Sequence, residues 1–232
     1  MATPKREIES DRIYHIINRG VENRVIFLSD KDYLRFVHDL YEFNDENKSY
    51  NVGYFFNKTP AIPIDPAGQY RKVMVKILAF CLMPNHYHLL LKTLNKNGLY
   101  RFVHKLNTGY AKYFNQRHNH AGVLFQGRYK LVPIVNESHF VHIPYYIHCN
   151  PLDLIASSWR EGKIKNPKKA VEFLSNYKWS SHLDYCGVSN FPSITERNFL
   201  LKVFGGSKKY RKMIENWLQE MKIEEVGNLN LE

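Results

Sequence analysis

The stretch Leu82-Met83-Pro84-Asn85-His86-Tyr87-His88-Leu89-Leu90-Leu91 decides the fold of this chain. Residues 73–81 mix β-branched, aromatic and aliphatic side chains and predict a first strand, followed by a turn or bulge at the proline. A second, buried strand then begins. Side chains alternate between the faces of a strand, so His86 and His88 are expected on one face and Tyr87 on the other. Two imidazoles in this arrangement can hold a divalent metal ion, provided that another element supplies a third ligand.

The composition favours a folded protein with a polyanionic partner. Hydrophobic residues make up 44% and aromatic residues 14% of the 232-residue chain, enough for a substantial core. Lys and Arg number 33 against 22 acidic residues, which gives a net charge of +11. Each phosphate that these side chains neutralise releases a condensed counterion, so a nucleic-acid backbone is a favoured partner. Tyr and Phe scattered among the basic residues suit single-stranded nucleic acid, whose unpaired bases stack on such rings.

Other features of the sequence bear on the compartment. No apolar run approaches the roughly 20 residues that a membrane helix needs. Residues 1–7 lack the apolar core of a signal peptide. The three cysteines are scattered and odd in number, which indicates neither a disulfide framework nor a cysteine zinc site. We therefore expect a cytoplasmic protein with no membrane partner.

Strand and helix patterns alternate in the first half of the chain. Residues 12–20 predict a strand that ends in a glycine. Ser29, with an acidic residue three positions later, predicts the start of an amphipathic helix that runs to about Asn44. The segment 45–72 is polar, with prolines near its end, and is expected to be a long loop or a small insertion. After the histidine strands, residues 99–114 predict a second helix.

The second half of a candidate site lies in residues 136–151, where the pattern predicts a helix. Tyr146 and Asn150 stand one helical turn apart, so a hydroxyl and an amide share one face. Asn150 precedes a proline, which disfavours the helical conformation, so the helix should end there. Pro144 lies inside the helix and should kink it or delay its start.

Basic and aromatic residues mark a candidate nucleic-acid surface. Residues 123–132 predict a strand pair or a bulged strand with a tip formed by Arg128, Tyr129 and Lys130. Arg19 lies at the end of the first predicted strand. We expect these four side chains to contact phosphates or unpaired bases.

Several segments, in this order, resemble the HUH-type single-tyrosine transposases. This family comprises the IS200-like insertion-sequence transposases and their relatives, and the resemblance is greatest to the REP-associated branch. The segments are YHIINRG at 14–20, MPNHYHLL at 83–90, LFQGRY at 124–129, YIHCNP at 146–151 and WSSH at 179–182. The resemblance spans roughly residues 10–187. It implies an α+β fold, in which helices pack on a central antiparallel sheet similar to the ferredoxin and RNA-recognition folds.

The resemblance also implies a chemistry. In this family two histidines and a Gln or Asn one turn after the tyrosine bind Mg²⁺ or Mn²⁺, which corresponds to His86, His88 and Asn150. The tyrosine attacks DNA, which corresponds to Tyr146, with its neighbour Tyr145 as a minor alternative. The implied protein is a metal-dependent endonuclease and strand transferase for single-stranded or hairpin DNA, acting through a 5′-phosphotyrosine intermediate. Imidazole suits Mn²⁺ better than Mg²⁺, so the ligands do not decide between the two metals.

The domain organisation that we expect is a catalytic domain over 1–187 and a C-terminal helical extension over 188–232. Residues 208–222 of the extension predict a basic amphipathic helix. We expect this helix to pack on the core, with hairpin binding or support of a homodimer as alternative roles.

Two other functions remain open. A domesticated protein could recognise hairpin DNA with little or no cleavage, although the intact His86, His88, Tyr146 and Asn150 argue against lost catalysis. An RNA-binding module of similar sheet topology is the other alternative. Stacking on RNA requires neither a metal site nor a tyrosine beside it. The presence of both therefore distinguishes a DNA-cleaving enzyme from an RNA-binding module.

Overall fold

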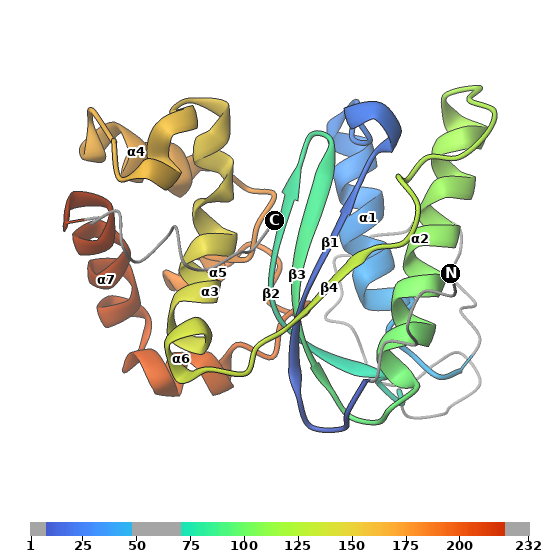
Figure 1. Ribbon diagram of the computed structural model, residues 1–232, viewed down its shortest axis with the longest axis horizontal. Helices are drawn as coiled ribbons and strands as arrows, with labels where there is room; N and C mark the ends of the chain where they lie inside the picture. The colour runs from blue at the N-terminus through green and yellow to red at the C-terminus, as the bar shows by residue number, and fades with distance from the viewer. Residues whose placement is uncertain (1–7, 48–70, 221–232) are drawn as a thin grey trace, which may run out of the picture.

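A computed structural model describes residues 8–47 and 71–220 of the protein. Its centre is a four-stranded sheet with the order β2-β3-β1-β4 (Figure 1), in which every neighbouring pair is antiparallel. The strands are β1 (Ile13–Arg19), β2 (Val75–Met83), β3 (His86–Thr93) and β4 (Lys130–Pro133). Helices cover both faces, so the expected α+β fold with a central antiparallel sheet is confirmed.

The histidine strand belongs to a tight hairpin at the centre of the sheet. Only Pro84 and Asn85 connect β2 to β3. The backbone N–H of Gly20, at the end of β1, donates to the carbonyl of Asn85 at 2.8 Å and holds the turn against its neighbour. A Cβ atom at Gly20 would lie 2.2 Å from the carbonyl oxygen of Arg24, so no larger residue fits this approach. The turn that precedes the histidines is thereby fixed in place.

One face of the sheet packs against α1 (Asp30–Glu42) and α2 (Gly98–Arg117). Ser29 precedes α1, and its N–H donates to the carboxylate of Asp32 at 2.8 Å, as the sequence predicted for this helix start. The core on this side is built from aliphatic and aromatic side chains of both layers. Its members include Tyr14, Ile16, Phe36, Leu40, Phe80, Tyr87, Leu89, Phe102, Leu106 and Tyr110.

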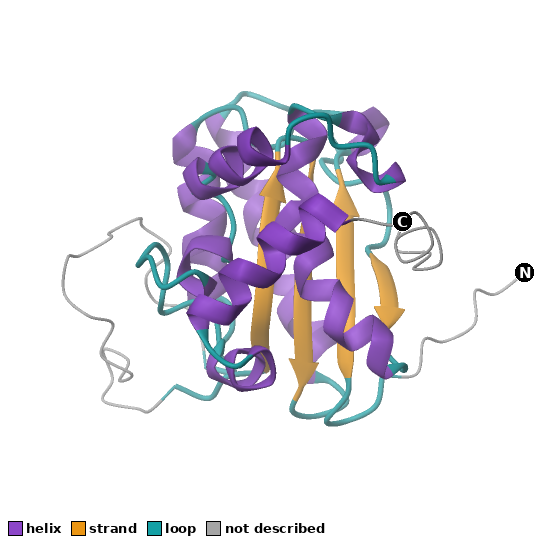
Figure 2. Cartoon of the chain, turned by 90° about the vertical axis from the view of Figure 1, so that its left-hand side faces the viewer, coloured by secondary structure: helices purple, strands orange, loops and turns teal. Residues whose placement is uncertain are grey.

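The second half of the chain covers the other face, as Figures 1 and 2 show. Its elements are α3 (Glu137–Cys149), the 3₁₀ helices η2 (Asn150–Leu154) and η3 (Ser157–Glu161), α4 (Pro167–Asn176), α5 (His182–Tyr185), α6 (Asn198–Phe204) and α7 (Ser207–Glu220). A further 3₁₀ turn, η1 (Val21–Asn23), follows β1. Among the helices that the structure describes, none combines the length and apolar character needed to span a bilayer.

The C-terminal helices share a core with α3. Tyr210, Ile214 and Leu218 form the buried stripe of α7 and join the same hydrophobic cluster as Tyr145 and Trp159. Burying an apolar side chain of this size contributes roughly 1.5–3 kcal/mol to stability. The structure therefore agrees with the expectation that the C-terminal helix packs on the core.

The structure departs from the sequence prediction around Pro144. We expected this residue to kink its helix or delay the start, but α3 begins at Glu137 and continues through Pro144 to Cys149. The delayed start is therefore wrong. The helix ends where predicted, with Asn150 as its C-cap ahead of Pro151.

The segment 123–132 is less regular than predicted. Within residues 123–132 only the part from Lys130 onward is a strand, and Phe125 makes an isolated bridge to Gly20. Gly127 between them has a φ of +66°, a left-handed conformation that a regular strand does not accommodate. Most of the predicted insertion, residues 48–70, lies outside the described residues.

Candidate active site

The two histidines of β3 lie on the face of the sheet that α3 covers. Their ring centroids are 4.9 Å apart, and the side chains are nearly inaccessible, with 7% of His86 and none of His88 exposed. Tyr87 between them packs on the opposite face, in the core formed with α1 and α2. The alternation that the sequence predicted is therefore present.

Hydrogen bonds indicate which ring nitrogen of His86 can bind a metal. Its Nδ1 atom lies 2.7 Å from the side-chain oxygen of Asn85. A carboxamide oxygen only accepts, so Nδ1 of the neutral ring carries the proton and Nε2 carries the lone pair.

His88 is oriented by a third histidine. Its Nδ1 atom lies 2.9 Å from Nε2 of His15 on β1. When His88 donates in this contact, its Nε2 lone pair is available to a metal. That Nε2 atom is buried and has no hydrogen-bond partner among the described residues. His15 is a residue that our sequence analysis did not single out.

Burial keeps His15 and His88 neutral. Desolvation, with the charge of Lys130 adding to it, lowers the pKa of His15 to about 3. Desolvation also lowers the pKa of His88 well below its usual range, and repulsion by nearby basic groups, among them Arg160 and Arg19, acts in the same direction. A neutral imidazole is the form that binds metal ions, so His88 fits a divalent cation, and the hydrogen bond from Nδ1 of His86 leaves its Nε2 lone pair for the same ion.

A third protein ligand must come from another residue type. Within the described ranges, no group of three His, Cys, Asp or Glu side chains is placed to hold a metal ion. Asn150, fully buried at the end of α3, offers a carboxamide oxygen instead. Its Nδ2 donates to the carbonyl of Tyr146 at 2.8 Å, which fixes the amide on the turn that carries the tyrosine.

Helix α3 presents Tyr146 to the histidines. The ring of Tyr146 meets His88 edge-on, with centroids 6.0 Å apart and an interplanar angle of 80°, and meets His15 in the same way at 6.1 Å. Only 2% of the side chain is exposed. The spacing of four residues thus puts Asn150 one helical turn beyond Tyr146, whose ring touches His88.

The neighbouring Tyr145 points elsewhere. Its ring stacks on Tyr210 of α7 at 5.5 Å, and its hydroxyl donates to the sulfur of Met213 at 3.3 Å. Burial in this aromatic cluster raises the pKa of the Tyr145 hydroxyl. Tyr145 therefore faces the C-terminal helices, away from the candidate ligands.

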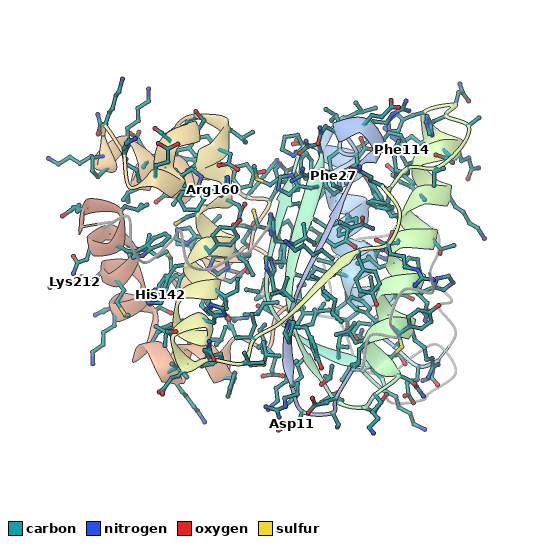
Figure 3. All side chains as sticks on the ribbon, in the orientation of Figure 1. Asp11, Phe27, Phe114, His142, Arg160 and Lys212 are labelled. Atoms are coloured by element: carbon teal, nitrogen blue, oxygen red, sulfur yellow. The ribbon has the colours of Figure 1, made fainter. Side chains whose placement is uncertain are left out.

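An arginine completes the surroundings of Tyr146. Arg160 of η3 donates from Nη2 to the side-chain oxygen of Asn150 at 2.7 Å, and its guanidinium carbon lies 5.4 Å from the centre of the Tyr146 ring. Figure 3 shows Arg160 on the side of the sheet that α3 covers. The sequence analysis missed this residue, because the 3₁₀ segments η2 and η3 carry no periodic pattern.

The predicted nucleic-acid residues occupy three different positions. Arg19 lies opposite His86 in the sheet register, and Lys130 lies opposite Ile17, which itself pairs with His88, so both share the histidine face. Arg128 is exposed at the turn that precedes β4.

Tyr129 belongs to neither position. It is half-buried and packs against the core on the α1 and α2 side, on the other face of the sheet. The structure therefore brings Arg19 and Lys130 close to the candidate ligands, with Arg128 nearby along the chain, and separates Tyr129 from them.

Comparisons with known proteins bear on the family to which this fold is similar. Residues 67–150 match a family model described as "Transposase IS200 like", a range that contains both strand histidines, Tyr146 and Asn150. The fold is similar to that of a REP-associated tyrosine transposase solved bound to a REP hairpin, with a TM-score of 0.50 and 15% identity over 82% of this chain and 90% of that chain. A search of curated proteins gives no match. The resemblance that the sequence motifs indicated is confirmed.

Proposed function

We propose that this chain, whose residues 67–150 carry the IS200-like transposase segment, is a metal-dependent endonuclease and strand transferase for single-stranded or hairpin DNA. One observation carries the proposal: Tyr146 lies edge-on against His88, with the Asn150 amide one turn further on. A structural tyrosine in a core needs neither a histidine pair nor a buried amide at that position. The hairpin in the structure of the similar REP-associated protein supports the choice of substrate.

The candidate ligands are Nε2 of His86, Nε2 of His88 and the side-chain oxygen of Asn150. This donor set would hold Mn²⁺ or Mg²⁺ with coordination positions left for phosphate oxygens. When bound, the metal supplies a Lewis acid that polarises the phosphate. Such help is needed because a phenol with a pKa of about 10 is a poor nucleophile at neutral pH.

Tyr146 performs the covalent step. Its hydroxyl oxygen attacks the phosphorus of a phosphodiester and loses its proton to solvent. The bond from phosphorus to the 3′ oxygen breaks, and that oxygen leaves as a hydroxyl after taking up a proton. The product is a 5′-phosphotyrosine and a free 3′-hydroxyl. Because the new ester conserves the energy of the old one, a 3′-hydroxyl can attack in reverse and rejoin strands without ATP.

Basic side chains on the histidine face would guide the DNA backbone to this site. Arg19 and Lys130 flank the strand histidines in the sheet register. The chain as a whole carries a net charge of +11, which favours association with a polyanion.

The test is capture of the covalent intermediate. The protein is incubated with Mn²⁺ and a pool of labelled DNA hairpins whose flanking sequences are randomised, and the products are separated on a denaturing gel. We expect a labelled band at the mass of protein plus DNA that disappears with EDTA and is absent with RNA hairpins. Tight hairpin binding without any adduct, in Mn²⁺ or Mg²⁺, would instead favour a binding protein that does not cleave.

A further inference from the structure

The segment after α3 holds an arginine rigidly beside the proposed nucleophile. Nη1 of Arg160 donates to both carboxylate oxygens of Asp153, at 2.5 and 2.6 Å. The indole N–H of Trp159 donates to the same carboxylate at 2.5 Å, and the guanidinium lies 4.9 Å from the centre of that ring. Trp159 is fully buried, whereas 26% of the Arg160 side chain is exposed. The arginine is thus held by Asp153 and Trp159, with part of its side chain exposed.

Arg160 also determines how the Asn150 side chain is turned. An arginine can only donate and a backbone carbonyl can only accept. The contact from Arg160 therefore requires the oxygen of the carboxamide on its side, and the contact to the Tyr146 carbonyl requires the nitrogen on the other. A carboxamide oxygen has two acceptor positions, so one remains for a metal ion.

The charge of Arg160 has two opposite effects at this site. It attracts a phosphate that approaches Tyr146, since the guanidinium carbon lies 5.4 Å from the centre of the Tyr146 ring. It also repels a divalent cation that shares the oxygen of Asn150. A neutral side chain that supports the loop would have neither effect.

We propose that Arg160 is a positioning residue for strand cleavage, which orients the carboxamide of Asn150 and holds a positive charge beside Tyr146 where the scissile phosphate must lie. Asp153 and Trp159 fix the guanidinium for this task. The inference rests on the proposed function, because it assigns Arg160 a part in the attack by Tyr146.

The test compares Arg160→Gln with Arg160→Lys and with a control, Arg12→Gln. Arg12 is exposed at the end of β1 remote from Arg19, where it pairs with Glu9. Three quantities are measured in each variant: the single-turnover rate of adduct formation at saturating Mn²⁺, the hairpin Kd, and the Kd for Mn²⁺ without DNA.

Loss of the Arg160 charge should change the adduct rate much more than it changes the hairpin Kd or the Kd for Mn²⁺. We expect Arg160→Gln to slow adduct formation about 10- to 100-fold, while hairpin affinity stays within about twofold of wild type. Binding of Mn²⁺ should change much less than the rate, because loss of the hydrogen bond that orients Asn150 weakens it while loss of a nearby positive charge strengthens it. Arg160→Lys keeps the charge without the planar guanidinium, so its rate of adduct formation should lie between those of wild type and Arg160→Gln. It also serves as the test variant if Arg160→Gln does not fold.

Two results would overturn the assignment while leaving the proposed function intact. One is an adduct rate in Arg160→Gln equal to that of Arg12→Gln. The other is a fall in Mn²⁺ affinity that parallels the fall in rate, which would mean that Arg160 only supports a ligand. Failure of the wild-type protein to form any adduct is a different outcome, since it overturns the proposed function and the role of Arg160 with it.

Discussion

The Nε2 atom of His15 lies 2.9 Å from the Nδ1 atom of His88, and the two rings stack at an interplanar angle of 15°. The contact joins β1 to β3 on the face where Tyr146 also lies. Metal-binding histidines commonly donate their second ring N–H to a fixed partner, which sets the orientation of the ring. His15 has the position and the burial of such a partner.

Removal of His15 should weaken metal binding without removing a ligand. We expect His15→Ala to lower the affinity for Mn²⁺ about 10- to 100-fold, because the His88 ring is then no longer held in its orientation. Titration of the protein with Mn²⁺ in the absence of DNA measures this. His15→Gln, which can place an acceptor near the same nitrogen, should bind Mn²⁺ more tightly than His15→Ala. Equal affinity in His15→Ala and wild type would show that His15 does not support a metal site.

Loss of a strand histidine should abolish cleavage and spare DNA binding. His86→Ala and His88→Ala each remove one of the proposed ligands, whereas affinity for the hairpin draws on basic groups elsewhere. Asn150→Ala should be milder, since water can take a vacated coordination position, and Asn150→Asp should retain activity. Adduct yield and hairpin Kd are measured side by side. Cleavage at the wild-type rate by either histidine variant would refute the assignment of the ligands.

The adjacent tyrosines should respond in opposite ways. Tyr146→Phe keeps the ring but lacks the attacking oxygen, so we expect no adduct, with hairpin affinity and Tm close to wild type. Tyr145→Phe removes only a 3.3 Å hydrogen bond to the sulfur of Met213, a weak acceptor. It should therefore form the adduct and lose less than about 1 kcal/mol of unfolding free energy. Adduct from Tyr146→Phe but not from Tyr145→Phe would mean that Tyr145, and not Tyr146, is the nucleophile.

Arg19, Lys130 and Arg128 should control the salt dependence of binding. Replacing Arg19, Lys130 or Arg128 by Ala should lower hairpin affinity and reduce the log–log salt slope by about one unit for each phosphate that is no longer neutralised. Arg12→Ala, at the other end of β1, is the control and should leave the slope unchanged. Binding is measured at several salt concentrations. Slopes that match the control in all three variants would place the DNA on another surface.

Acid should destabilise the protein through a buried histidine remote from the metal ligands. Burial, with the charge of Arg211 adding to it, lowers the pKa of His182 from 6.5 to about 4. Between these values the unfolded chain binds a proton that the folded chain does not. The contribution of His182 to stability is therefore complete above pH 6.5 and falls by up to about 1.4 kcal/mol for each pH unit below it.

Unfolding by urea at pH 7, 6 and 5 measures this dependence. Gln cannot titrate, so the free energy of unfolding of His182→Gln should fall less steeply with acid than that of the wild type. The two slopes should differ by up to about 1.4 kcal/mol per pH unit, the value for one bound proton. The same slope in both proteins would show that His182 is not held neutral in the folded state.

The local parts of the fold and site were predictable from sequence. A proline turn between two apolar runs predicted the β2-β3 hairpin. The strand period of two predicted that His86 and His88 share a face, and the four-residue spacing predicted that Tyr146 and Asn150 share a turn of helix. Each of these relations depends on one element and its immediate neighbours.

The parts that depend on how elements meet were not predictable. His15 reaches His88 only because β1 pairs with β3 in one particular register, which a single sequence does not define. Arg160 reaches Asn150 through two 3₁₀ helices, whose short turns leave no periodic signature. The delayed helix start predicted from Pro144 was wrong, because packing of the buried residues of α3 outweighed the local preference of proline against helix interiors.

The alternation along β3 affects how a genetic screen of this protein should be interpreted. Tyr87, between His86 and His88, is fully buried; its hydroxyl donates to Asn107 of α2 at 2.6 Å, and its ring lies 4.9 Å from that of Phe36 in α1. Substitutions at Phe36 or Asn107 would shift the strand and so displace the histidines on its far side. Inactivating alleles would therefore map to both faces of the sheet, and those near α1 and α2 would report the position of the strand, not a surface that touches DNA.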